Sequence, residues 1–558
     1  MGTIPETGTP ARAYGDPDVA GSPPLAQGRP RAAVEASAPP VATGILIART
    51  PCGATVSGAT RAGFGHELRH ALGETGAVGA TVRQLAARLD DRPERVERAL
   101  SDLRLRGDVL RMGRGLYVLR DFGQLDARAD FVDPAAFVER FERENDVGLG
   151  RYAGPITFRS NEALPIHRWW PYVQGYSAEF VRGVFDATDL PPSATVLDPF
   201  AGSGTTLVEA RRAGMRALGT ELLAPAVLAA RVKTHFELSP KALRTAARRT
   251  VRNGARRRAG ALPFLRETRR QFDPEALRDL TRLRDALPLG GTPVTDALRL
   301  AFGRVLIPSS RLHRSPCLGY DHRHRASDRT PFDRFTAAVE EMANDLAELR
   351  PSRRRWGPAA RVEEGDARVA AWPRGSVDLA VTSPPYVNGM DYVMNYKIDL
   401  AWLGYARSYS DLASLRSAEV ACDNLPRSET VAYRTTVNTP DPWLEEILPR
   451  IRDNVARKGS YRRDDVHAVV HRYFADLVPV LARMRTALAP GGRFVLVVGD
   501  SLLAGTYVPG DLLTARLGAS LGYRIVSVEV ARSRRSGQRR SFVLRESVVT
   551  LEAPRAAT

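Results

Sequence analysis

Two short segments contain the residues whose types and spacing could do chemistry, and the first is LDPFAGSGTTLVEA at 197–210. A buried strand is expected at 194–198, followed by a glycine-rich loop and then a helix. Glycines in such a loop let a ligand approach the main chain closely. No lysine follows the last glycine, and half of the dinucleotide fingerprint is missing, which excludes both phosphate-binding loop types. The candidate ligand-binding residues here are Asp198, Pro199, Phe200, Gly202, Gly204 and Thr205.

A second carboxylate, Glu221, ends the next expected strand, RALGTE at 216–221. An acidic side chain at the end of the second strand can accept hydrogen bonds from both hydroxyls of a ribose. The carboxylate of Asp198 suits an ammonium group better than a pyrophosphate. An adenosine that carries an amino-acid arm satisfies both carboxylates. The alternative is a purely structural turn, which would not account for the two carboxylates.

The second segment is VDLAVTSPPYVNGMDY at 377–392, and its candidate catalytic residues are Ser383, Pro384, Pro385 and Tyr386. Two consecutive prolines at a strand end remove two main-chain donors. What remains is a row of acceptors, namely the hydroxyl of Ser383 and the carbonyls of Ser383 and Pro384, beside the flat ring of Tyr386. This surface would hold an exocyclic amino group and stack its base, which must first be flipped out of a duplex. A plain Pro-Pro turn is the alternative.

Together, DPFAGSGTT and TSPPY resemble the amino-methyltransferases of DNA, which methylate cytosine N4 or adenine N6 with S-adenosylmethionine. The resemblance covers roughly 160–240 and 360–405, and more weakly 466–552. It implies an α/β class I methyltransferase fold, which is Rossmann-like with a mostly parallel sheet and an antiparallel last strand. It also implies that Asp366 reads the adenine amino group of the cofactor, and that 167–185 closes over the methionine moiety.

The order of the motifs departs from many members of that family, because the cofactor motif precedes the catalytic one. Serine before Pro-Pro is more frequent in enzymes that modify cytosine, so cytosine N4 is favoured over adenine N6. The mechanism would be a direct displacement that needs neither a metal nor a covalent intermediate. A cytosine-C5 enzyme would need a thiolate, and the Pro-Cys pairs at Cys52 and Cys317 are interpreted as coincidental. Two further alternatives are an RNA guanine-N2 methyltransferase and a DNA-binding regulator with an inactive methyltransferase core.

The rest of the chain is expected to position these motifs. Its net charge of +18 and its excess of arginine favour a polyanionic partner, although arginine-rich composition alone is also common. The expected segments are a disordered tail at 1–60, a winged helix-turn-helix at 61–121, a linker at 122–160, the cofactor half of the core at 161–240, a basic helical insertion and possible target-recognition region at 241–359, the catalytic half at 360–405, a second, irregular insertion at 406–465, and the C-terminal part of the core at 466–555.

The winged helix-turn-helix is expected to place its third helix in the major groove and its wing on the backbone. The alternative is a unit that contacts protein or acts as a spacer. The basic runs at 242–258 and 309–325 are candidates for phosphate and base contacts, with a solvated helical face as the alternative for the first. The arginines expected on the third helix and wing are Arg92, Arg95, Arg98, Arg104, Arg111 and Arg114.

Three cysteines cannot supply a disulfide framework, and no apolar run approaches the roughly 18–20 residues that span a bilayer. No secretory signal is visible at the N-terminus. A cytoplasmic protein without metal is therefore expected, with double-stranded DNA as its partner. A cognate restriction nuclease or defence-system proteins are further candidate partners.

Overall fold

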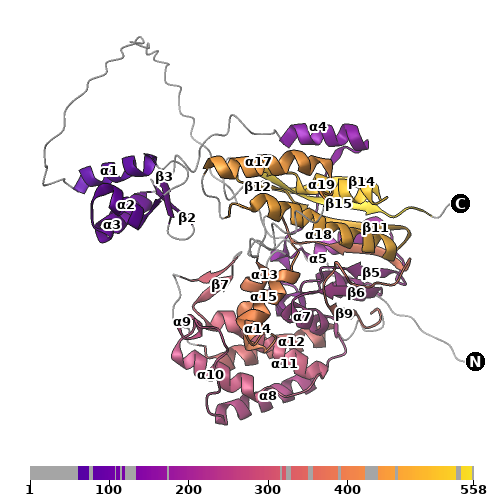
Figure 1. Ribbon diagram of the computed structural model, residues 1–558. Helices are drawn as coiled ribbons and strands as arrows, with labels where there is room; N and C mark the ends of the chain where they lie inside the picture. Colours follow the sequence, from indigo (N-terminus) through magenta and orange to yellow (C-terminus); the bar gives the residue numbers. More distant parts are fainter. Residues whose placement is uncertain are drawn as a thin grey trace, which may run out of the picture. The chain divides into compact units, whose positions relative to one another are not determined.

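The computed structural model describes most of the chain from residue 61 onward (Figure 1). The tail expected at 1–60 lies outside the described residues. No helix among the described residues is long and apolar enough to cross a membrane. The described ranges are 61–74, 80–106, 109–112, 116–119, 134–172, 175–314, 317–321, 329–349, 356–387, 391–420, 438–458, 463–535 and 542–555.

The centre of the fold is a mixed sheet, in which eight strands of the described residues pair in the order β4-β14-β15-β11-β10-β5-β6-β9. The five strands from β11 to β9 are parallel, and the last strand of the chain, β15, is antiparallel to both of its neighbours. The expected mostly parallel sheet with an antiparallel last strand is thus confirmed. The strands are β4 (Leu149–Arg151), β5 (Thr195–Asp198), β6 (Arg216–Glu221), β9 (Arg361–Glu364), β10 (Val377–Thr382), β11 (Leu488–Gly499), β14 (Arg524–Arg535) and β15 (Val543–Glu552).

Helices cover both faces of this sheet (Figure 1). In β11, Phe494, Leu496 and Val498 join one hydrophobic core, whereas Val495 and Val497 join the core of the opposite face. Alternate side chains of a strand point to opposite faces, so an uninterrupted apolar run is what a sheet covered on both sides requires. The helices on the first face are α17 (Pro442–Lys458), α18 (Val466–Ala487) and α19 (Gly510–Ser520), and those on the second are α5 (Ala178–Thr188), α6 (Thr205–Arg212) and part of α7 (Ala224–Thr234).

Part of the segment expected as a linker belongs to the core. Helix α4 (Pro134–Asn145) buries Phe137 and Phe141, and the Phe137 ring lies 5.2 Å from that of Trp443 in α17. Strand β4 then pairs in parallel with β14 at the edge of the sheet. The two phenylalanines have the i, i+4 spacing of a buried helix face, but a three-residue strand leaves no periodic signal in the sequence.

The basic insertion is helical and shares a hydrophobic core with α7 and with α14 (Lys397–Trp402). In α8, Leu243, Ala247, Thr250 and Gly254 form the buried face, which packs against α10 and α12. The insertion is therefore packed onto the cofactor half of the core. Its elements are α8 (Pro240–Arg256), α9 (Thr268–Gln271), α10 (Pro274–Ala286), α11 (Pro293–Leu306), the hairpin β7 (Leu312–Arg314) and β8 (Leu318–Tyr320), and α12 (Pro331–Leu349).

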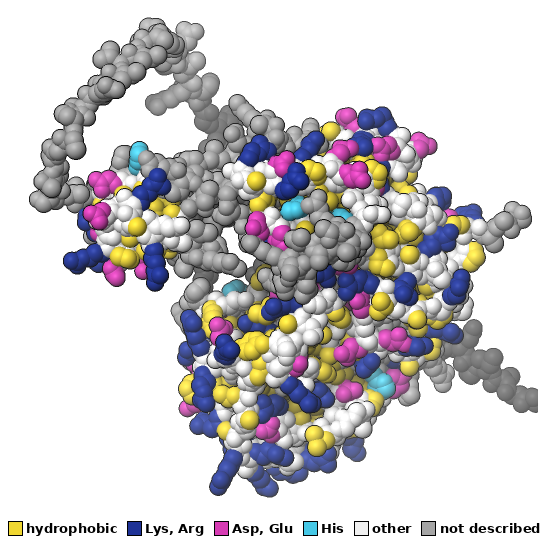
Figure 2. Space-filling model, in the orientation of Figure 1, with side chains coloured by type: hydrophobic (Ala, Val, Ile, Leu, Met, Phe, Trp, Pro, Cys, Tyr) yellow, Lys and Arg dark blue, Asp and Glu magenta, His cyan; other side chains and the backbone are white. Residues whose placement is uncertain are grey.

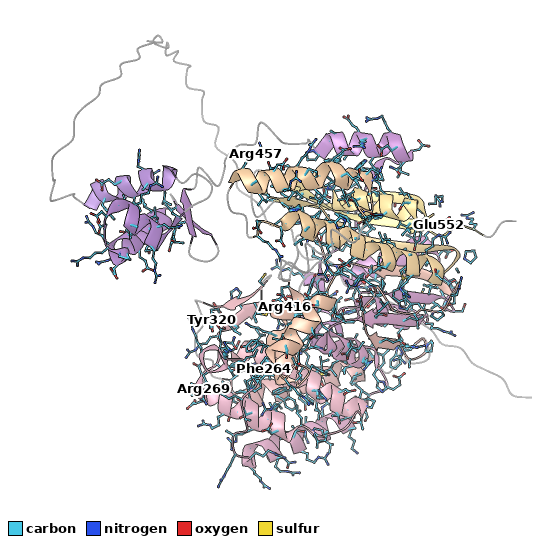
Figure 3. All side chains as sticks on the ribbon, in the orientation of Figure 1. Phe264, Arg269, Tyr320, Arg416, Arg457 and Glu552 are labelled. Atoms are coloured by element: carbon cyan, nitrogen blue, oxygen red, sulfur yellow. The ribbon has the colours of Figure 1, made fainter. Side chains whose placement is uncertain are left out.

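The second insertion, expected to be irregular, contains helix α15 (Tyr409–Ala418) as well as α17. Ser408 and Asp411 form a capping box at the start of α15, a local signal that the polar composition obscured. The ring of Phe264, labelled in Figure 3, meets that of Tyr409 edge-on at 5.2 Å, so the two insertions contact each other. In the sequence, the short helices α13 (Tyr392–Asn395) and α14 (Lys397–Trp402) lie between β10 and the second insertion.

The N-terminal unit has its own small core and is described by itself. Thr81 caps α2 and forms a capping box with Gln84, which agrees with the cap expected from the sequence. The strands pair in the order β1-β3-β2. Helices and a ribbon in this order are what a winged helix-turn-helix requires, but that identification stays a prediction. The elements are α1 (Arg61–Glu74), β1 (Ala80–Thr81), α2 (Val82–Leu89), α3 (Pro93–Arg106), β2 (Val109–Met112) and β3 (Leu116–Leu119).

Candidate functional site

Four adjacent parallel strands end at one edge of the sheet, and the residues predicted to bind a ligand follow them. β5 ends at Asp198, β6 at Glu221, β9 just before Asp366 and β10 just before Ser383. The carboxyl ends of parallel strands are where open α/β sheets bind ligands. A cavity at this edge is lined by eight of the predicted residues, namely Pro199, Phe200, Gly202, Thr205, Glu221, Asp366, Ser383 and Pro385.

Glu221 is tied to the glycine loop by its carboxylate. Its Oε2 accepts a hydrogen bond from the Gly202 amide at 2.8 Å, and its Oε1 accepts one from the Leu223 amide at 2.9 Å. Burial raises the pKa of Glu221 to about 7, against the lowering effect of these two amides. The side chain lines the cavity and has lone pairs left over, so it can accept the hydroxyl groups of a ligand.

Asp198 lies behind the cavity and is not among the residues that line it. Its carboxylate accepts hydrogen bonds from Tyr176 Oη at 2.5 Å, Thr382 Oγ1 at 2.7 Å and the Phe200 amide at 3.0 Å. Burial raises the pKa of Asp198 to about 6. Since Tyr176 lines the cavity, Asp198 holds a wall residue, the start of the glycine loop and the end of β10 together.

The two loop glycines serve different purposes. Gly202 has a φ of 50°, and a Cβ placed on it would lie 2.9 Å from Cε1 of Tyr172, another lining residue. Gly204 has a φ of 85° and is the N-cap of α6, where a Cβ would lie 3.0 Å from the Cα of Ala230 in α7. Gly202 therefore belongs to the cavity, whereas Gly204 allows α6 and α7 to pack closely and does not line it.

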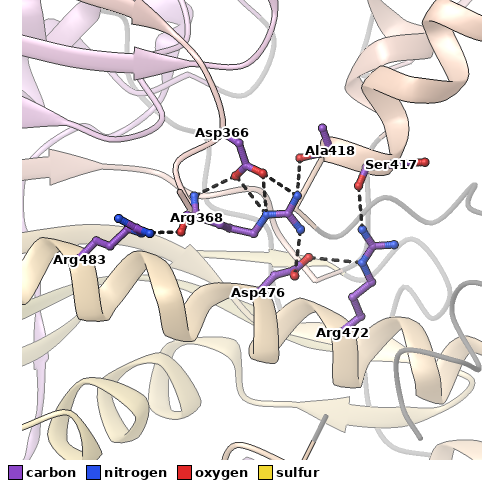
Figure 4. A network of polar contacts seen from close by, with 7 residues as sticks. All are labelled: Asp366, Arg368, Ser417, Ala418, Arg472, Asp476 and Arg483. Atoms are coloured by element: carbon purple, nitrogen blue, oxygen red, sulfur yellow. Dashed lines mark hydrogen bonds and ion pairs between the residues drawn. The ribbon is translucent and has the colours of Figure 1, made fainter. Parts of the chain in front are cut away.

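Asp366 is held by Arg368 in a network of charges (Figure 4). Arg368 Nη2 donates to Asp366 Oδ2 at 2.7 Å, and the Arg368 amide donates to Oδ1 at 2.8 Å. The same guanidinium donates to the Ala418 carbonyl at 2.9 Å and lies 3.0 Å from Asp476 of α18. A carboxylate oxygen has more than one lone pair, so Asp366 can still accept a hydrogen bond from a ligand in the cavity.

This network also places a wall that the sequence did not indicate. Arg472 donates to the Ser417 carbonyl at 3.0 Å, beside the contact of Arg368 with Ala418. Ala418, Glu419 and Val420 then line the cavity. These residues lie in the second insertion, whose polar sequence carries no motif for them. Tyr172 and Tyr176, which line the cavity as well, lie within the segment expected to close over the ligand.

Ser383 stands between this cavity and a second one, because it lines both. Its hydroxyl donates to the Val497 carbonyl at 3.1 Å. Tyr386 lines the second cavity, and its hydroxyl donates to the carboxylate of Glu546 in β15. Burial raises the pKa of Tyr386 well above its ordinary value, and the Glu546 charge adds to the shift. Pro384 lines neither cavity.

The predicted basic surfaces are found in part. Of the six arginines predicted on the third helix and wing, Arg95 and Arg98 are exposed on α3 and Arg92 is exposed just before it, and the other three side chains lie outside the described residues. Arg95 is ion-paired with Asp91 at 2.9 Å. On α8, the exposed face opposite the buried one carries Arg248, Arg249, Arg252 and Arg256. Figure 2 shows Lys and Arg side chains gathered over the end of the molecule that α8 forms in Figure 1.

A family model described as DNA methylase, for N6 and N4 methyltransferases, matches residues 189–230. The type II methyltransferase M.BsoBI of Geobacillus stearothermophilus is 22% identical over 72% of this chain and 88% of its own length. The type II methyltransferase M.AvaI of a Nostoc species is 23% identical over 67% of this chain and 82% of its own length. A solved SAM-dependent methyltransferase of Methanosarcina mazei, 10% identical, covers 67% of this chain and 97% of its own with a TM-score of 0.24.

Proposed function

We propose that this chain is a member of the DNA amino-methyltransferase family and transfers a methyl group from S-adenosylmethionine to an exocyclic amino group of a base in double-stranded DNA. The observation that carries the proposal is the position of Ser383, which lines both the cavity with the glycine loop and the cavity with Tyr386. A methyl donor in the first cavity and a base in the second would meet at this serine.

The residues of the first cavity fit S-adenosylmethionine, which supplies an electrophilic methyl group when bound. Glu221 accepts the ribose hydroxyls, and Asp366 accepts the adenine amino group. Gly202 and Thr205 allow the methionine arm to lie against the loop, with Pro199 and Phe200 beside it. Asp198 acts on the arm through Tyr176, which it holds in the cavity wall. The two carboxylates of the cavity thus provide acceptors for the donor groups of the ribose and of the adenine.

At the catalytic motif, the chain provides acceptors for an amino group. The Ser383 hydroxyl has given its hydrogen to Val497, so its lone pairs are the part that can face the base. Together with the main-chain carbonyls before the prolines, it draws the amino hydrogens out of the plane of the base. The nitrogen lone pair would then attack the methyl carbon as its bond to the sulfonium sulfur breaks, which would leave S-adenosylhomocysteine, and the methylated nitrogen would release its extra proton to water. Tyr386 stacks the flipped base. Cytosine N4 is the favoured target, since serine precedes Pro-Pro.

DNA would be held by the basic surfaces. The exposed arginines of α8 and α3 fit phosphate oxygens, and the N-terminal unit fits the winged helix-turn-helix mode of docking. Because the relatives are type II methyltransferases, modification in partnership with a cognate restriction nuclease is part of this proposal.

Transfer of a tritiated methyl group from S-adenosylmethionine to duplex DNA, with tRNA as the competing substrate, tests the proposal. We expect label in DNA, none in tRNA, and loss of label in Ser383→Ala. Mass spectrometry of the nucleosides should show N4-methylcytosine, whereas N6-methyladenine would overturn the choice of base. Label in tRNA alone would establish the RNA alternative, and no transfer with intact DNA binding would favour the regulator.

A further inference from the structure

The second cavity contains more positive charge than stacking of a base requires. It has a volume of about 580 Å³, within the range of cavities that hold small ligands. Beside Ser383 and Tyr386 it is lined by four arginines and two glutamates, namely Arg159, Arg314, Arg532, Arg534, Glu162 and Glu546.

Two of these arginines are neutralised by buried carboxylates. Arg532 is ion-paired with Glu546, its partner across the β14–β15 register, and Glu546 also accepts the Tyr386 hydroxyl. Arg314 is ion-paired with Asp399, which is 1% exposed. Their charges are therefore used inside the protein and leave little for a ligand.

The other two have no acidic partner among the described residues. Arg534 donates from Nη2 to the Asp500 carbonyl at 2.7 Å, which fixes the direction of the side chain without neutralising it. Its Nε is buried and has no hydrogen-bond acceptor within the described part of the chain. A buried N–H without an acceptor is costly. Arg159, in the short helix η4 (Phe158–Glu162), is exposed and forms no ion pair with any described residue.

Arg534 lies close to the stacking ring. A Cβ placed on Gly499 would lie 3.0 Å from Cε2 of Tyr386 and 3.6 Å from Nη2 of Arg534. The guanidinium and the ring thus both lie next to the same glycine. A base stacked on Tyr386 brings its sugar and phosphates with it, at the distance of one nucleotide from the ring.

We propose that Arg534, together with Arg159 of the same cavity, binds a backbone phosphate next to the target nucleotide when its base is flipped into the second cavity. This inference rests on the proposed function and deepens it. The guanidinium pairs well with phosphate because its parallel N–H groups match two phosphate oxygens. Since every nucleotide has this phosphate, the contact stabilises the flipped state without reading the sequence.

The test uses the full chain and a duplex with the target site located by sequencing the DNA of cells that express the protein. One duplex is unmodified, and in two others the phosphate on the 5′ or the 3′ side of the target nucleotide is an uncharged methylphosphonate. Wild-type protein should bind one of the modified duplexes about ten- to a hundredfold more weakly than the unmodified one. Arg534→Ala should show the same loss on unmodified DNA and no further loss on that methylphosphonate, because the two changes remove the same contact.

Arg524→Ala is the matched control, since Arg524 begins the same strand and is ion-paired with Glu552 at 2.8 Å. It should bind all three duplexes as the wild type does. Binding of S-adenosylhomocysteine by Arg534→Ala should be unchanged, which shows that the variant is folded, and Arg159→Ala should repeat the pattern with a smaller loss. Additive losses with both methylphosphonates would overturn the proposal. A wild-type protein that methylates no DNA would instead refute the proposed function.

Discussion

The hydroxyl of Ser383 donates its hydrogen to the Val497 carbonyl, with the two oxygens 3.1 Å apart, and this serine lines both cavities. Ser383→Ala removes an acceptor that matters most as the amino group becomes tetrahedral. We expect a loss of about a hundred- to a thousandfold in the single-turnover rate, with unchanged binding of DNA and cofactor. Wild-type rates in this variant would mean that Thr-Ser-Pro-Pro-Tyr is only a structural turn.

Tyr386 should tolerate loss of its hydroxyl better than loss of its ring. Tyr386→Phe breaks the hydrogen bond to Glu546 but keeps the stacking surface, whereas Tyr386→Ala removes about 1–3 kcal/mol of stacking. The alanine variant should regain part of its rate on a duplex with a mismatched target base, because flipping that base costs less. Ser383→Ala should show no such recovery. Single-turnover assays on matched and mismatched duplexes distinguish the two roles.

Cofactor binding should depend on the ionisation of Glu221. Burial raises the pKa of this carboxyl to about 7, and ribose hydroxyls donate to its ionised form. The affinity for S-adenosylhomocysteine should therefore rise about tenfold from pH 6 to pH 8. Glu221→Gln serves as the control, because its profile retains only the titration of the ligand and of other groups. Calorimetry that gives parallel profiles for the two proteins would contradict this role.

The same pKa shift has the opposite sign for the stability of the ligand-free protein. The raised pKa means that burial favours the protonated carboxyl, so the contribution of Glu221 to stability is full below its ordinary pKa of 4.5 and is lost as the pH rises through about 7. Bound cofactor supplies donors to the ionised group. The increase in Tm on adding S-adenosylhomocysteine should consequently be larger at pH 8 than at pH 6, and Glu221→Gln should lose this difference.

Arg368 should act as a positioning residue for Asp366. Arg368→Ala frees the Asp366 carboxylate and releases Ala418 from its contact at 2.9 Å. We expect weaker binding of S-adenosylhomocysteine and, in addition, a smaller preference for it over S-inosylhomocysteine, which lacks the adenine amino group. General unfolding would instead lower the affinity for both ligands by the same factor. Arg483→Ala is a suitable control, because this exposed side chain reaches only the main chain of the network.

DNA affinity should depend steeply on salt. If about six phosphates are contacted, the logarithm of the binding constant falls with a slope near −5 against the logarithm of salt concentration. Replacing Arg248 and Arg252 on α8 should make the slope less steep by about one per contact. Deletion of residues 1–120 should lower DNA affinity and leave cofactor binding intact. Loss of cofactor binding in that deletion would make the N-terminal unit part of the catalytic fold.

Motifs with local chemistry could be predicted from the sequence, and contacts between distant segments could not. The glycine loop, Glu221 and Ser383 could be predicted to lie at strand ends because glycines and apolar strands leave clear local signals in the sequence. A mostly parallel sheet with an antiparallel last strand was also expected, but the order of its strands was not. That Asp198 accepts hydrogen bonds from Tyr176 and Thr382 depends on three segments meeting in space. The wall at 418–420 and the edge strand β4 were missed for the same reason: each is defined by what it packs against.

The position of β15 also constrains how the chain is made. β15 lies between β11 and β14 and pairs with both, yet it is synthesised after them. On the ribosome, the parallel strands can assemble first, but one edge of β11 stays unpaired until residues 543–552 emerge. An open strand edge invites pairing with another chain. The nascent protein is therefore exposed to aggregation until β15 pairs, and a chain cut before residue 543 would hold an unclosed sheet.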